Sequence, residues 1–160
     1  MPNDKTAARA SDSTGSAPSL LAAEIDHLIE RHFPEIHFGG KTIFIDAVTA
    51  KGAALHMKNH PRHLRPGGTV SGPAMFALAD LAVYAAILGR IGERGLQAVT
   101  TNMALNFLRR PEPGDILADV ELLAFGKRLI VAEVRLIAAT TGALVAIATA
   151  TYAMPAAGKI

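Results

Sequence analysis

The stretch from Ser71 to Arg90, SGPAMFALADLAVYAAILGR, limits the choice of fold more than any other part of the sequence. Every residue from Ala74 to Leu88 is apolar except Asp80. The run is long for a strand, has no interior Gly or Pro, and is followed by GRIGERG, which is typical of a helix end. The pattern predicts a helix from about Pro73 to Leu88 that is buried on nearly all sides, because it has no polar face.

Asp80 needs a physical reason to lie in this helix. A carboxylate in an apolar environment is costly unless it is paired, hydrogen-bonded or required for chemistry. Two interpretations follow from the residues alone: Asp80 caps a group or pairs with an arginine across a subunit interface, or it belongs to a functional site.

Two elements are predicted before the apolar helix. Residues 19–33 have apolar side chains at helical spacing, which predicts an amphipathic helix opened by Ser19 and closed before Pro34. Residues 41–59 alternate and carry β-branched side chains around a Lys-Gly turn, which indicates a hairpin of two strands. Residues 1–18 are small and polar, so we expect a disordered tail before a single domain over 19–160.

Four strand-like segments follow the apolar helix, and the short turns between them predict an antiparallel meander; they are 96–110, 115–126, 128–140 and 143–155. In the first segment, simple alternation places Thr100 on the face opposite Val99, Thr101 and Met103. A sheet of about six strands wrapped around one long helix is an α+β arrangement, the hot-dog architecture.

Composition excludes several classes of function. The chain has no cysteine, which removes disulfides and thiol chemistry and fits a reducing compartment such as the cytoplasm. Its net charge is only +2 and its basic residues are scattered, so we expect no nucleic-acid partner. We also expect no secretory signal and no membrane span, because the longest apolar run is interrupted by Asp80. Half of the residues are hydrophobic, which favours burial of some surface against a second subunit.

The segment GGTVSGPAMFALADLAVYAA, followed by NFLRRPEPGD, resembles hot-dog acyl-CoA thioesterases of the phenylacetate-degradation (PaaI-like) subfamily. Their motif is GTxHGG, with nine residues from the His to an Asp, and then FLRP and GD. Ser71 plus nine is Asp80, and the resemblance extends from about Phe44 to Met154. It implies an acyl-CoA thioesterase that works as a homodimer, often paired into tetramers, with each site at a subunit interface. It implies no separate cofactor, since coenzyme A is part of the substrate.

The resemblance also implies roles for three residues. Asp80 matches the carboxylate that acts either as general base on water or as nucleophile toward the thioester carbonyl. Gly72 matches a glycine whose backbone N–H points at the thioester oxygen, where the free N–H groups and dipole of a helix start stabilise an oxyanion. Thr100 matches a strand position at which related enzymes place a Ser or Thr near the attacking water.

Three positions depart from the family pattern. Ser71 stands in place of the His, Pro73 in place of the second Gly, and Arg65 in place of an Asn six residues before the His. Pro73 has no N–H, so the Ser71 hydroxyl and the Arg65 guanidinium are the candidate helpers for Gly72. Loss of one oxyanion donor costs on the order of a hundredfold in rate, so a non-catalytic acyl-CoA-binding protein remains an alternative.

Other residues are candidates for substrate contacts. Arginine binds phosphate in a fork, so two basic pairs could hold the coenzyme A phosphates: Arg109 with Arg110, and Lys127 with Arg128. The acyl group is expected along the apolar helix, near Met75, Phe76 and Tyr84.

His60 and His63 suggest a metal site, but two histidines without a carboxylate are too few ligands, and we expect no metal. A hot-dog hydratase or dehydratase would need a His beside the carboxylate. His63 is the nearest candidate, but its spacing does not match that motif, so this function ranks below the thioesterase and the binding protein.

Overall fold

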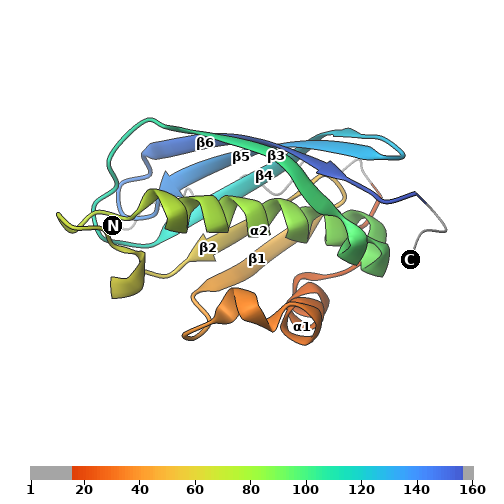
Figure 1. Ribbon diagram of the computed structural model, residues 1–160, viewed down its shortest axis with the longest axis horizontal. Helices are drawn as coiled ribbons and strands as arrows, with labels where there is room; N and C mark the ends of the chain where they lie inside the picture. Colours follow the sequence, from red (N-terminus) through yellow and green to blue (C-terminus); the bar gives the residue numbers. More distant parts are fainter. Residues whose placement is uncertain (1–15, 157–160) are drawn as a thin grey trace, which may run out of the picture.

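A six-stranded antiparallel sheet curls around one long helix, α2 (Gly72–Ile91), in the computed structural model of the protein (Figure 1). The structure describes residues 16–156, so most of the predicted tail over 1–18 lies outside the described residues. Helix α1 (Ala22–His32) packs beside β1, outside the curl of the sheet. The α+β architecture expected from the sequence is confirmed.

The strand order is β1-β2-β4-β5-β6-β3, and every neighbouring pair is antiparallel. The predicted first hairpin and the meander of the last three strands are confirmed. The strands are β1 (Ile43–Thr49), β2 (Gly52–Met57), β3 (Val99–Phe107), β4 (Ile116–Phe125), β5 (Leu129–Ala138) and β6 (Leu144–Ala153).

The prediction that β3 continues directly into the meander was wrong, because β3 pairs with β6 at the far edge of the sheet. The segment between β3 and β4 crosses from one side of the curl to the other. Its Leu108 N–H donates to the carbonyl of Val145 in β6 (2.8 Å), whereas the carboxylate of Asp115 accepts from the N–H of Asn59, just after β2 (2.8 Å). This crossing leaves β3 as an edge strand.

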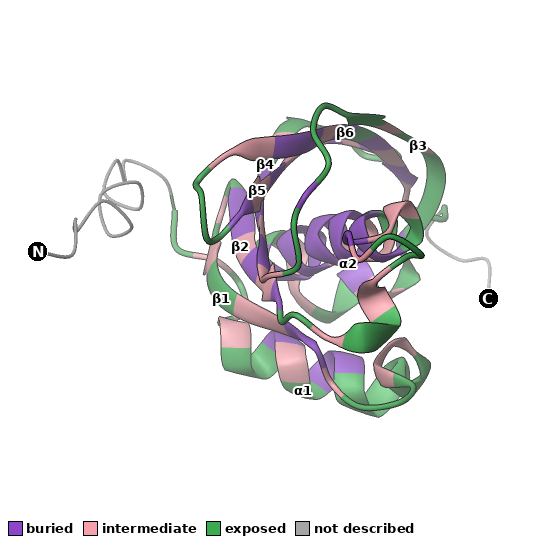
Figure 2. Ribbon diagram, turned by 90° about the vertical axis from the view of Figure 1, so that its left-hand side faces the viewer, coloured by how far each residue is buried: buried purple, intermediate pink, exposed green. Residues whose placement is uncertain are grey.

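Helix α2 is buried as predicted, and Figure 2 shows it enclosed by the sheet. It continues to Ile91, three residues beyond the predicted end, and closes at Gly92, whose φ of 69° suits glycine. Gly89 lies inside the helix and does not end it. Its missing side chain lets Val48 and Ile25 pack closely against the helix. The stretch over residues 72–97 contains an 18-residue segment that is apolar enough to span a membrane, but 61% of that segment is buried, as in the core helix of an α+β domain.

Ser19 does not open α1, contrary to the prediction. Its hydroxyl donates to the carbonyl of Arg90 (2.9 Å) and its N–H to that of Gly89 (2.7 Å), which fastens the chain to the end of α2. The N-cap of α1 is Leu21, whose N–H donates to the carboxylate of Glu24 (2.7 Å). Sequence patterns place a Ser near helix starts correctly but cannot show which backbone group its hydroxyl meets.

Candidate active site

Asp80 lies half-buried in the middle of α2, and two hydroxyl groups donate to the same oxygen of its carboxylate. Thr100 Oγ1 lies 2.8 Å from Oδ1, and the Tyr152 hydroxyl lies 2.5 Å from Oδ1. Across residues 16–156, Oδ2 has no hydrogen-bond partner and Asp80 forms no ion pair. The charge is therefore held by neutral donors, and one oxygen is left for another molecule.

A bulge in β3 brings Thr100 to Asp80. Thr100 is paired with Tyr152 and Asn102 with Thr151, so Thr101 is the extra residue. Residues directly opposite in a ladder share a face, which places Thr100 on the inner face with the buried Tyr152. Met103 is paired with the buried Ala150 and lies on this face too. Simple alternation, which placed Thr100 and Met103 on opposite faces, was wrong at this point.

Tyr152 is a member of the site that sequence analysis missed. It is 2% exposed, and burial raises its pKa far above the ordinary value, with a further contribution from the neighbouring Asp80 carboxylate. Its hydroxyl is therefore protonated and available as a donor. One sequence signal was available: a tyrosine among small residues at an inner position of β6 needs a partner for its hydroxyl.

The start of α2 leaves one backbone N–H free. The Ala74 N–H donates to Ser71 Oγ (3.2 Å), the Met75 N–H donates to the carbonyl of Ser71 (3.1 Å), and Pro73 has no N–H. In the described chain, the Gly72 N–H makes no hydrogen bond. Of the first four helix positions, Gly72 alone offers a donor, while Ser71 serves as the N-cap.

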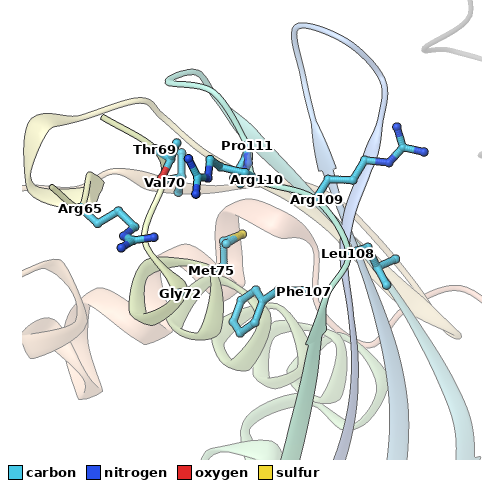
Figure 3. A pocket seen from close by; sticks show the side chains of 10 residues that line it. All are labelled: Arg65, Thr69, Val70, Gly72, Met75, Phe107, Leu108, Arg109, Arg110 and Pro111. Carbon is cyan, nitrogen blue, oxygen red and sulfur yellow. The ribbon is translucent and has the colours of Figure 1, made fainter. Parts of the chain in front are cut away.

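Two cavities meet at the start of α2. The first, which we call the Asp80 cavity, has a volume of about 620 Å³ and an apolar wall; it is lined by Ile36, Gly72, Pro73, Phe76, Ala77, Asp80 and Phe107. The second, the arginine cavity, has a volume of about 370 Å³; it is lined by Arg65, Thr69, Val70, Gly72, Met75, Phe107, Leu108, Arg109, Arg110 and Pro111 (Figure 3). Gly72 and Phe107 belong to both, so the two cavities are continuous at these residues.

The predicted phosphate-binding residues fall into two separate places. Arg109 and Arg110 line the arginine cavity together with Arg65, and Figure 3 shows Arg110 beside Thr69 and Val70 while Arg109 extends away from Met75. Lys127 and Arg128 lie in the β4–β5 turn, at the end of the sheet where Arg90 covers the Phe125 ring. A single copy of the chain therefore does not bring the two basic pairs together.

Tyr84 and the histidines lie outside both cavities. Tyr84 donates to the carbonyl of Leu96 (3.2 Å), and burial raises the pKa of its hydroxyl. His63 Nε2 is 2.8 Å from Thr42 Oγ1, and His60 Nδ1 accepts the Arg62 N–H (3.2 Å). Over residues 16–156 no three His, Asp or Glu side chains cluster as metal ligands, and no histidine is hydrogen-bonded to Asp80.

Comparisons with known proteins identify the family and the fold. The family model described as the thioesterase superfamily matches residues 67–145. A candidate thioesterase of Silicibacter sp. has a similar structure, with a TM-score of 0.77 and 39% identity over 89% of this chain and 96% of that one. No curated protein matches the sequence significantly.

Two more distant structures share the fold. Thioesterase superfamily member 2 of zebrafish is 23% identical over 86% of this chain and 100% of that one, with a TM-score of 0.73. A variant of the phenylacetic acid degradation protein of Thermus thermophilus is 23% identical over 71% of this chain and 93% of that one, with a TM-score of 0.63.

Proposed function

This chain belongs to the thioesterase superfamily and is a thioester hydrolase, and from that premise we propose that it hydrolyses a small or medium acyl-CoA with Asp80 as the reacting carboxylate. The observation that carries the proposal is the free Oδ2 of Asp80 in an apolar cavity, while Oδ1 is held by Thr100 and Tyr152. Oδ2 either accepts a proton from water or attacks the thioester carbonyl itself.

The two cavities suit the two halves of an acyl-CoA. The aromatic and aliphatic wall of the Asp80 cavity, with Ile36, Phe76 and Phe107, suits an acyl group. The guanidinium groups of the arginine cavity suit the phosphates of coenzyme A, and a substrate that occupies both cavities passes Gly72 and Phe107. Phosphate recognition rests here on Arg110, with Arg65 and Arg109 at the same opening.

Gly72 supplies the oxyanion donor in this proposal. Its N–H is free and lies at the positive end of the α2 dipole, where negative charge on the thioester oxygen is stabilised. Gly72 and Asp80 are eight residues apart on one helix, which separates them by about 12 Å along its axis. One thioester carbonyl group is too small to contact Gly72 and Asp80 of the same helix across this distance. The distance therefore favours a site in which one copy of the chain contributes Gly72 and a second copy contributes Asp80.

A homodimer formed along β3 would build such a shared site. Strand β3 has a free edge, and exposed apolar side chains lie on or beside it: Val99, Phe107 and Leu108 are 58%, 54% and 52% exposed. Symmetric pairing of two β3 edges would place the start of one α2 helix near Asp80 of the other copy. We include in the proposal further pairing into tetramers and a cytoplasmic location, which the absence of cysteine suits.

The first experiment measures free-thiol release from short, long and aromatic acyl-CoAs by the wild type, Asp80→Asn and a control, Asp119→Asn. Asp119 lies in β4, where it is paired across the sheet with Arg135, and it belongs to neither cavity. We expect release by the wild type and the control, and loss of release with retained acyl-CoA binding in Asp80→Asn. Unchanged hydrolysis by Asp80→Asn would remove the central claim.

A second function is favoured by one observation. Ser71 and Pro73 leave a single free N–H at the start of α2, which is a sparse oxyanion site. Tight acyl-CoA binding in calorimetry, without thiol release from any substrate in the panel, would identify a binding protein that has given up the reaction.

Mixing two inactive variants tests the shared site. Asp80→Asn removes the carboxylate and Gly72→Pro removes the N–H, so each homodimer should be inactive. If the residues act across an interface, a mixed dimer contains one intact site of two, and equal mixing restores about a quarter of the wild-type rate. If both residues act within one chain, mixing restores nothing. The sedimentation of each preparation gives its oligomeric state.

A further inference from the structure

We propose that Tyr152 is a positioning residue for hydrolysis: its hydroxyl fixes the Asp80 carboxylate so that Oδ2, and not Oδ1, meets the substrate. This inference rests on the proposed function, since it assigns a role in the reaction of Asp80. Tyr152 lies in β6, the last of the described strands, 72 residues from Asp80 in sequence.

The contact has the geometry of a hydrogen bond to an ionised acceptor. The hydroxyl oxygen is 2.5 Å from Asp80 Oδ1, within the short range that charge-assisted O–H···O⁻ bonds show. The same oxygen lies 2.9 Å from the main-chain carbonyl oxygen of Asp80. A tyrosine hydroxyl has one proton, so the shorter contact to the carboxylate is the one that uses it. Tyr152 thus contacts Asp80 at both its side chain and its backbone.

A second donor makes the arrangement specific to one oxygen. Thr100 and Tyr152 are directly opposite each other in the β3–β6 ladder, and both hydroxyl groups reach Oδ1. Rotation of the carboxylate would break two hydrogen bonds, so the side chain stays in one orientation. Asp80 lines the Asp80 cavity, and its Oδ2 has no protein partner among the described residues.

Packing alone does not require this hydroxyl. The Tyr152 ring is part of the hydrophobic core, and a phenylalanine would fill the same space. A buried tyrosine hydroxyl normally needs a partner, and here that partner is the carboxylate assigned to the reaction. Burial also raises the pKa of Tyr152, which keeps the donor protonated throughout the pH range of an assay.

The test compares Tyr152→Phe with Tyr84→Phe, the matched change at the only other tyrosine of the chain. Tyr84 donates to a backbone carbonyl in η3 (Gly92–Gln97) and lies outside both cavities. We expect kcat of Tyr152→Phe to fall by on the order of tenfold or more at unchanged KM, because the substrate still binds but the carboxylate is less well aimed. Tyr84→Phe leaves both hydrogen bonds to Asp80 Oδ1 in place, so it should not reproduce the loss of kcat at unchanged KM.

The Asp80→Asn background shows whether Tyr152 acts through Asp80. In that background Tyr152→Phe should cause no further loss of the residual rate, because the group that it positions is already absent. A further loss of the same size would overturn the proposal, and so would a wild-type kcat in Tyr152→Phe alone. Absence of thiol release by the wild type would overturn the proposed function, and this inference with it.

A second measurement applies if Tyr152→Phe does not fold. Fluorotyrosine introduced into Tyr84→Phe protein labels position 152 alone and keeps its ring and hydroxyl. We expect its ¹⁹F signal to shift when an unreactive acyl-CoA thioether fills the Asp80 cavity, and Asp80→Asn to abolish that shift. A signal that responds to neither change would show that the hydroxyl is not coupled to the reacting carboxylate, and the proposal would fail.

Discussion

The tip of the Phe107 ring is directed at Gly72: a Cβ atom built on Gly72 would be 3.3 Å from Cζ of that ring and 3.8 Å from Cε1 and Cε2. These two residues also line both cavities. The contact therefore sets the width of the opening between the arginine cavity and the Asp80 cavity, through which the proposed substrate would pass.

Gly72→Ala should narrow this passage without harming the fold. The added methyl group forces the Phe107 ring to move by a few tenths of an ångström, and the ring is exposed enough to do so. We expect KM for acyl-CoA to rise several-fold, with a free energy of unfolding equal to or slightly above the wild type, because alanine suits a helix better than glycine. Steady-state kinetics and urea unfolding measure the two effects.

A second substitution checks the cause. Phe107→Leu in the Gly72→Ala protein removes the ring that the methyl group meets, so KM should return toward its value in Phe107→Leu alone. If Gly72→Ala leaves KM unchanged, the substrate does not pass between these two residues.

Arg110→Gln should weaken the binding of coenzyme A more than the chemistry. A guanidinium–phosphate contact at an exposed site is partly screened by salt, so we expect KM for acyl-CoA to rise about fivefold at low ionic strength and less at high. An acyl-pantetheine thioester lacks the nucleotide phosphates, and its KM should not change.

The matched control is Arg94→Gln, an exposed arginine in η3 beyond the other end of α2. This substitution should leave the KM values for acyl-CoA and for acyl-pantetheine unchanged. Equal effects of Arg110→Gln on acyl-CoA and acyl-pantetheine would show that Arg110 does not contact a phosphate.

The stability of the fold should decrease as the pH falls below about 6.5, in part because of His63. Burial lowers the pKa of His63, and the charges of Arg62 and His60 lower it further. The unfolded chain then binds a proton at His63 more readily than the folded chain. The contribution of His63 to stability is therefore complete above the ordinary pKa of histidine and is lost as the pH falls through its lower pKa in the folded state.

His63→Gln keeps a partner for Thr42 but cannot be protonated, so its unfolding free energy should fall less between pH 7 and pH 5. Burial also lowers the pKa of His37, so part of the dependence of stability on pH should remain in this variant. Urea titrations at a series of pH values measure the difference, and identical slopes for wild type and variant would contradict this role of His63.

The parts of the fold that follow local pattern were predictable. The apolar character of α2 apart from Asp80 placed it in the core, and the short turns between β4, β5 and β6 placed them in one meander. The partner of β3 was not predictable from turns, because the segment after Phe107 crosses the molecule before β4 begins. Short turn-like sequences show that the chain changes direction, but they do not show which strand it meets next.

The site was predictable where one residue stood out from its surroundings. Asp80 was singled out because it is charged within an apolar helix, and Gly72 because it matches a glycine of the family motif. Tyr152 was missed because nothing in its own strand shows that Asp80 lies opposite it. Only the family resemblance directed attention to Thr100, which the structure shows hydrogen-bonded to Asp80. Alternation placed Thr100 on the wrong face, because a bulge adds a residue without a visible change in the sequence pattern.

The strand order also determines at which stage of synthesis the sheet of this domain can form. Within the described residues β3 pairs only with β6, and β6 is synthesised after the other five strands. Before β6 is made, β3 has no partner strand. The ladder that aligns Thr100 with Tyr152 and the hydrogen bond from Tyr152 to Asp80 are then missing. Such contacts between distant parts of a chain form slowly. A nascent chain arrested before β6 would therefore carry Asp80 and Gly72 but lack the Tyr152 hydroxyl, so the candidate site forms only after β6 has been made.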